Sequence, residues 1–211
     1  MADEIRIGYF LEDRGHENLL KAFVARVAKD KGLKPGDWLD EVRVATGGKS
    51  IQAYRNFLKD IIYKDRPIPF HILIVGSDGN CMGYLDKKNQ LLGYAEKAKF
   101  PRPDILIFAI PDPHIERWYL DDPQGFNKAI GSGALPVLPQ YKCEKGLYKK
   151  VMRDVIASSD VKPQFGGYEY GEKIVEEMDL YGAIKADNSL KHFIDDLSSA
   201  LTRITTQEKI D

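Results

Sequence analysis

The chain contains few of the residues that build metal centres and disulfide frameworks. It has two cysteines, Cys81 and Cys143, and four histidines among its 211 residues. Neither cysteine belongs to a CxxC pair or has a histidine at the spacing of a zinc ligand. A zinc site or a disulfide framework is therefore not expected, and we predict that both cysteines are reduced thiols.

The chain also lacks an excess of either charge and a long hydrophobic run. Its lysines and arginines number 31 and its acids 32, a net charge of −1, which excludes a protein that coats nucleic acid by overall charge alone. Its apolar runs are far shorter than the ~20 residues of a membrane-spanning helix, and its first residues do not show the pattern expected of a signal peptide. We therefore expect a soluble, cytoplasmic protein.

The order of apolar segments predicts an α/β fold. Strand-like segments at 4–11, 42–45, 70–75 and 105–110 are separated by stretches with helical periodicity. The segment at 70–75 is apolar on both faces, as a central parallel strand should be. Because helices between consecutive strands imply parallel crossovers, we predict a doubly wound sheet of about four parallel strands with helices on both faces.

The pattern changes after residue 130, where a glycine- and proline-containing link begins. We predict an α/β core over residues 1–130 and a C-terminal helical extension over residues 131–211 that packs on the core. Helical periodicity in the extension is found near residues 145–157, 171–185 and 188–203.

Acidic residues follow three of the predicted strands. Glu12 comes after the first, Asp78 after the third and Glu116 after the fourth. Because the carboxyl ends of parallel strands meet at one edge, we expect these acids to share a site, where crowded carboxylates favour a bound Mg²⁺ or Mn²⁺. The same acids suit turns and helix caps, and that interpretation stays open. His16 and His114 lie beside them and are either proton carriers or caps.

Three segments resemble the motifs of the Toprim (topoisomerase–primase) fold. They are FLED, which contains Glu12; VGSDGN, which contains Asp78 and Asn80; and IERWYLDDP, whose Glu-x-Trp-x-x-x-Asp-Pro pattern contains Glu116 and Asp122. The chain is similar to the small Toprim-like proteins of unassigned function and to their relatives, the overcoming-lysogenization-defect nucleases. The segment DNSLKHFIDDL resembles the helix that closes those small proteins, so the resemblance spans most of the chain.

The resemblance implies a site for Mg²⁺ or Mn²⁺. In that site Glu12, Asp78 and Glu116 are the catalytic residues, and Glu12 acts as a ligand or as a general acid or base. The implied metal ligands are Glu12, Asp78, Asn80, Glu116 and Asp122. Asn80 stands where the family pattern has a second acid, and a neutral oxygen at this place binds one metal more weakly or not at all.

Two groups of basic residues are candidates for phosphate or nucleic-acid contact. The first is TGGKS at residues 46–50, where Lys49 and exposed backbone N–H groups suit one phosphate. The Walker pattern is incomplete because Arg43 stands where it requires glycine, and a plain Gly-Gly turn into a helix is equally favoured. The second group lies in the predicted extension and includes Lys145, Lys149 and Lys150. A solvated helix face is the alternative for this group.

The leading hypothesis is a metal-dependent phosphodiesterase or nuclease that acts on DNA or RNA. By resemblance, such proteins serve in defence against phage or mobile elements, often beside an ATPase partner. The competing hypothesis is a catalytically degenerate Toprim domain that binds nucleic acid or a partner protein, and Asn80 favours it. A fragment of a topoisomerase or primase is a weaker third interpretation, because the sequence offers no companion domain with a nucleophilic tyrosine.

Overall fold

Four parallel strands form one sheet in the computed structural model, which describes residues 4–45, 50–64, 68–131, 134–141, 143–159 and 161–207. The strands lie in the order β2-β1-β3-β4 and all neighbours are parallel. They are β1 (Ile5–Leu11), β2 (Trp38–Val44), β3 (Ile72–Gly76) and β4 (Leu106–Ala109). The prediction of an α/β fold with about four parallel strands is confirmed, although β2 begins at Trp38 rather than at residue 42.

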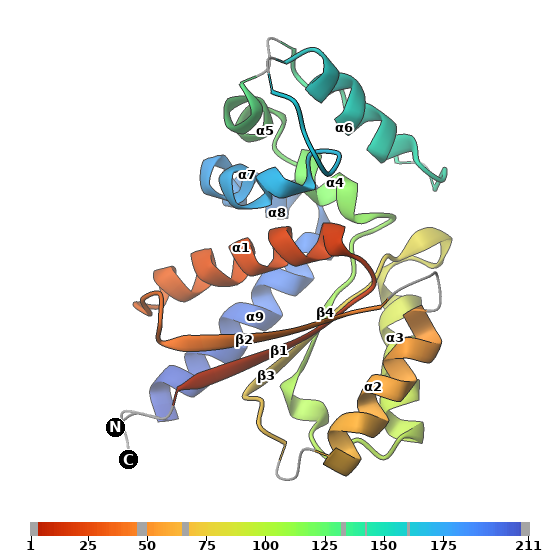
Figure 1. The fold of residues 1–211 in the computed structure, drawn as a ribbon, viewed down its shortest axis with the longest axis vertical. Coiled ribbons are helices and arrows are strands. Elements are labelled where there is room, and N and C mark those ends of the chain that lie inside the picture. The colour runs from red at the N-terminus through yellow and green to blue at the C-terminus, as the bar shows by residue number, and fades with distance from the viewer. Residues whose placement is uncertain are drawn as a thin grey trace.

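Helices lie on both sides of this sheet (Figure 1). On one side are α1 (Arg14–Asp30) and α9 (Asn188–Gln207), and on the other are α2 (Ser50–Lys64) and α3 (Tyr84–Lys97). Alternate residues of each strand face opposite sides, so Ile74 joins the hydrophobic cluster of α1 and α9 while Val75 joins that of α2 and α3. This burial on both sides explains why β3 is apolar throughout.

The remaining helices gather beyond α1, away from the sheet (Figure 1). They are α4 (Ile115–Leu120), α5 (Pro123–Ile130), α6 (Leu147–Ala157), α7 (Gly171–Glu177) and α8 (Leu180–Ala186). Short 3₁₀ turns are η1 (Asn80–Met82), η2 (Pro103–Ile105) and η3 (Tyr168–Tyr170). Within the described ranges, no helix combines the length and the apolar character that crossing a membrane requires.

One prediction for the extension differs from the structure. The helix expected over 171–185 is divided into α7 and α8, and Asp179 caps the second of them by accepting a hydrogen bond from Gly182 N at 3.1 Å. Side chains of α6, α7 and α9 join the same hydrophobic cluster as β1 and α1. The residues after 131 therefore contribute to the core that supports the sheet.

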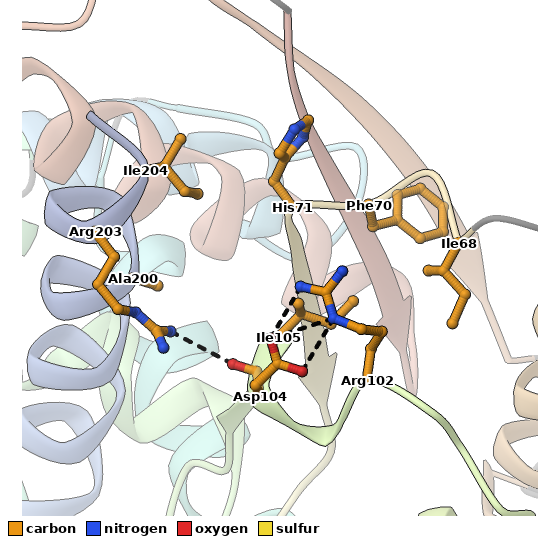
Figure 2. Close-up of a pocket in the computed structure, with 9 residues that line it drawn as sticks. All are labelled: Ile68, Phe70, His71, Arg102, Asp104, Ile105, Ala200, Arg203 and Ile204. Carbon is orange, nitrogen blue, oxygen red and sulfur yellow. Dashed lines mark hydrogen bonds and ion pairs between the residues drawn. The ribbon is translucent and has the colours of Figure 1, made fainter. Parts of the chain in front are cut away.

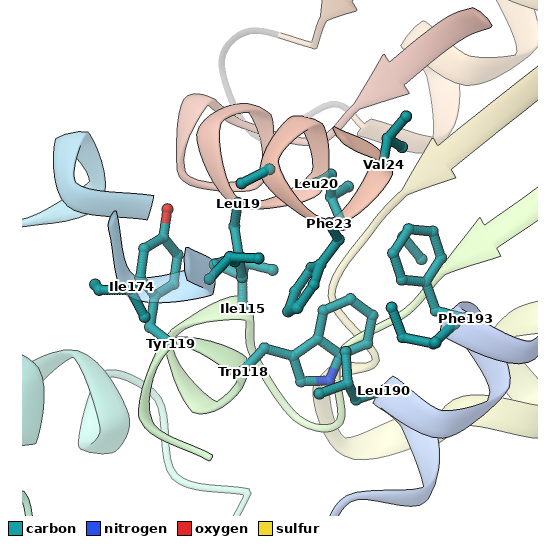
Figure 3. Close-up of a cluster of buried hydrophobic side chains, with 14 of the residues drawn as sticks. Leu19, Leu20, Phe23, Val24, Ile115, Trp118, Tyr119, Ile174, Leu190 and Phe193 are labelled. Carbon is teal, nitrogen blue, oxygen red and sulfur yellow. The ribbon is translucent and has the colours of Figure 1, made fainter. Parts of the chain in front are cut away.

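Trp118 anchors α4 in that cluster (Figure 3). Its ring is stacked on Phe193 of α9 at a centroid distance of 5.6 Å and meets Phe23 of α1 edge-on at 6.3 Å. Its indole Nε1 donates to Ser189 Oγ at 2.9 Å, so the one polar atom of the fully buried side chain has a partner. This packing fixes the orientation of α4, whose first turn carries Glu116.

The prediction of two reduced cysteines is wrong for this structure. Cys81 of η1 and Cys143, which precedes α6, form a disulfide with a Cα–Cα distance of 5.3 Å. The two residues are 62 positions apart, and only the tertiary fold brings them together. A search for short cysteine spacings has no means of detecting such a pair.

Candidate functional site

Residues that follow β1, β3 and β4 meet at the carboxyl edge of the sheet. Glu12, directly after β1, accepts hydrogen bonds at Oε2 from Ser77 Oγ (2.7 Å) and from Asp78 N (3.0 Å). Gly76, the last residue of β3, leaves room for Leu11 and Leu20, because a Cβ there would lie 2.9 Å from Leu11 Cδ2 and 3.0 Å from Leu20 Cδ1. Two of the predicted catalytic positions are therefore in direct contact.

Asp78 lies at the centre of the site and is 16% exposed. Its Oδ1 accepts a hydrogen bond from Ile115 N at 2.9 Å, which ties the loop after β3 to the first turn of α4. Its Oδ2 lies 3.3 Å from His114 Nδ1, and its Oδ1 lies 3.4 Å from His16 Nε2, an ion-pair distance without hydrogen-bond geometry. The carboxylate is thus held between two histidines.

The histidines and carboxylates shift one another's proton affinities. Burial alone would lower the pKa of the fully buried His16, but Asp13 and Asp78 raise it to about 10. The hydrogen bond that His114 donates to Asp78 likewise raises the pKa of His114 against the effect of burial, helped by the charges of Glu116 and Glu12. Burial would raise the pKa of Asp78, yet both histidines hold it well below its usual range. The network therefore favours imidazolium cations beside ionised acids.

Glu116 reaches the same edge from α4 and has a partner that the sequence analysis missed. The hydroxyl of Tyr168, in η3, donates to Glu116 Oε1 at 2.5 Å. Burial, together with this carboxylate, raises the pKa of Tyr168, so the side chain remains a phenol that can donate. The signal that could have revealed Tyr168 is the pair of glycines before it, since both adopt positive φ and shape the loop that carries it.

The residues at this edge do not fit the magnesium ion that the resemblance implies. Asp122 caps α5 by accepting from Gln124 N, and it also accepts from Asp179 N. Asn80 donates its amide to the carbonyl of Asp78. Among the side chains that the structure describes, no group of three His, Cys, Asp or Glu is arranged to hold a metal ion. Asp78 is paired with histidines, Glu116 with Tyr168 and Asp122 with backbone N–H groups, so these acids are not gathered around a common point.

A basic side chain approaches the site from α6. Lys145, Lys149 and Lys150 are exposed, and Lys149 Nζ lies 5.9 Å from the ring centroid of Tyr168, the partner of Glu116. Of the predicted basic group, Lys149 therefore lies close to the partner of Glu116. Lys49, the other predicted phosphate contact, falls outside the described residues.

A separate pocket of about 250 Å³ lies at the opposite edge of the sheet (Figure 2). His71, just before β3, lines it together with Arg102 and Arg203. Arg102 is paired with Asp104 at 2.9 Å, and His71 Nδ1 accepts a hydrogen bond from Arg6 N. Since it lies at the amino ends of β3 and β4, this pocket is no part of the carboxylate–histidine site.

Fold and site together define an α/β protein with a network of carboxylates and histidines at the carboxyl edge of a parallel sheet. No family model, curated protein or solved structure matches the chain.

Proposed function

We propose that the chain hydrolyses phosphodiester bonds of nucleic acid at this edge. The observation that carries the proposal is the convergence of Glu12, Asp78 and His114 from three separate strand ends. Acid–base hydrolysis of a phosphodiester needs one group that accepts a proton and one that donates a proton. Carboxylates and a histidine lie next to each other at this edge of the sheet.

Each side chain then has a role in one balanced step. The carboxylate of Glu12 accepts a proton from water as the water oxygen forms a bond to phosphorus. His114 donates its proton to the leaving oxygen as the old P–O bond breaks. Asp78 keeps His114 in place through the 3.3 Å contact and favours its protonated form. This step uses no metal ion, because the His, Cys, Asp and Glu side chains that the structure describes are not arranged to hold one.

The position of α6 supports nucleic acid as the substrate. Lysines along a helix that leads to an acidic edge can follow a phosphate backbone, and Lys149 lies over the ring of Tyr168. The Toprim relationship, a role in defence against phage or mobile elements and an ATPase partner belong to the same proposal and are supported by the motifs alone.

A binding protein without catalysis is the second candidate. It is favoured by the engagement of both Asp78 oxygens within the chain and by the neutral amide at Asn80. The two candidates differ in whether the nucleic acid is cut.

Labelled single-stranded DNA and RNA, incubated with the protein in EDTA or with added Mg²⁺ or Mn²⁺, distinguish these candidates. We expect cleavage without metal, and we expect Glu12→Gln and His114→Gln each to lower the rate by about 100-fold or more. The matched controls are Glu17→Gln, whose carboxylate pairs with Lys21, and His71→Gln at the other edge of the sheet.

Three outcomes contradict the proposal in different ways. Binding without cleavage by any preparation would support the second candidate. Cleavage that requires Mg²⁺ or Mn²⁺ would overturn the metal-free step and show that the acids rearrange around an ion. Equal losses in the controls would place the activity elsewhere.

A further inference from the structure

A second cavity, of about 580 Å³, lies next to the candidate site and takes no part in the proposed step. It is formed by the start of α3, the loop after β4, the junction of α8 and α9, and Tyr141. Asp112, on its wall, is two residues from His114, which places the two side chains on one short loop. The volume is in the range of pockets that hold small organic ligands.

Asp112 presents a fixed hydrogen-bond acceptor to this cavity. Tyr141 donates its hydroxyl to Asp112 Oδ1 at 2.8 Å, and the backbone N of Asp112 donates to Ser189 Oγ at 3.2 Å. The other oxygen, Oδ2, faces Gly83 at the start of α3, where an added Cβ would lie 3.7 Å away. Because carboxylate oxygens accept hydrogen bonds, a ligand that supplies N–H or O–H donors fits this wall.

Aromatic side chains line the same cavity. Tyr84 and His192 are stacked at a centroid distance of 4.6 Å, and Tyr141 is 52% exposed. His192 and Tyr141 are exposed and can stack on a flat ligand ring, whereas Tyr84 is buried and packs against His192. The positive charge of Arg117 is compensated by Asp187, whose Oδ2 lies 2.8 Å from Arg117 Nε. Arg117 therefore gives the cavity no preference for an anionic ligand.

We propose that this cavity binds a guanine base of the nucleic-acid substrate. Guanine presents two adjacent donors, N1–H and the N2 amino group, which match the two oxygens of a carboxylate. Adenine and cytosine place a ring acceptor beside their amino group, and uracil has one N–H between two carbonyls, so each turns at least one acceptor toward Asp112. This inference rests on the proposed function in one respect, namely that the guanine belongs to the nucleic-acid substrate.

Calorimetric titration with GMP, AMP, CMP and UMP tests the proposal. We expect GMP to bind at least about tenfold more tightly than the other three, since the others leave the carboxylate poorly paired. Asp112→Asn keeps the shape and the acceptor for Tyr141 but replaces one oxygen by a donor, and it should lower GMP affinity about tenfold or more. Asp86→Asn, another acid on the cavity wall, is the matched control and should leave GMP affinity within about twofold.

The results of this experiment are independent of catalysis. GMP binding that survives Glu12→Gln and is lost in Asp112→Asn supports the base site whether or not the protein cleaves nucleic acid. Equal affinity for all four nucleotides, or an unchanged affinity in Asp112→Asn with a normal thermal unfolding curve, would overturn it. Equal weakening by Asp112→Asn and Asp86→Asn would also overturn it, because that pattern assigns no specific role to Asp112.

Discussion

At the scale of single residues, His16 makes a prediction about stability and pH. Its pKa is raised from 6.5 to about 10 in the folded protein. The contribution of His16 to the free energy of unfolding is therefore fully present below pH ~6.5 and is lost as the pH rises toward ~10. We expect the unfolding temperature to fall across this range, and to fall less in His16→Gln. Thermal unfolding followed by circular dichroism at several pH values measures this, with His71→Gln as the control. A pH dependence unchanged by His16→Gln would refute the assigned ion pairs.

The same residues show how far sequence reasoning reaches. Glu12 and Asp78 were predictable as neighbours because a parallel sheet brings the ends of its strands to one edge. The contacts of His16 and His114 with Asp78 were not predictable, since either ring could have been a helix cap. Which of the two roles a histidine takes depends on the direction of its side chain. Tyr168 was not predictable as the partner of Glu116, because the two residues are 52 positions apart and meet only through the packing of η3 beside α4.

At the scale of elements, the loop that carries Tyr168 depends on Gly167. This residue has φ of 97°, and a Cβ there would overlap Ile156 Cδ1 and lie 2.9 Å from Met152 Cε, both on α6. We expect Gly167→Ala to destabilise the protein by about 2 kcal/mol through backbone strain and the displaced contact with α6. Gly166→Ala is the matched control, because φ is also positive there but the nearest atom, Tyr168 Cε2, is 3.9 Å away.

Chemical denaturation of both variants separates these two causes. The control should cost about 1 kcal/mol, which is the backbone part alone. Equal losses in the two variants would mean that the loop does not pack on α6 as described. Cleavage assays on the same variants then show whether a displaced Tyr168 also affects the site.

The limits of prediction at this scale follow from the same packing. The buried strands were readable because they are short and apolar on both faces, whereas β2 is an edge strand of half-exposed and exposed residues whose first half carries no strong pattern. The break between α7 and α8 was missed because the cap at Asp179 is a single side-chain contact inside a continuous helical periodicity.

At the scale of the whole molecule, the disulfide between Cys81 and Cys143 joins the loop after β3 to the segment that leads into α6. It closes a loop with a sequence separation of 62, for which the chain-entropy model gives a stabilisation of about 4 kcal/mol. We expect reduction by dithiothreitol to lower the free energy of unfolding by up to this amount. The Cys81→Ser/Cys143→Ser double variant should match the reduced protein and should not respond to dithiothreitol.

Thiol alkylation followed by mass spectrometry checks the pairing directly, because the oxidised protein should take up no label at either cysteine. Full labelling of both cysteines without reductant, with no change in stability on adding it, would mean that tertiary packing alone holds α6 beside the acidic edge.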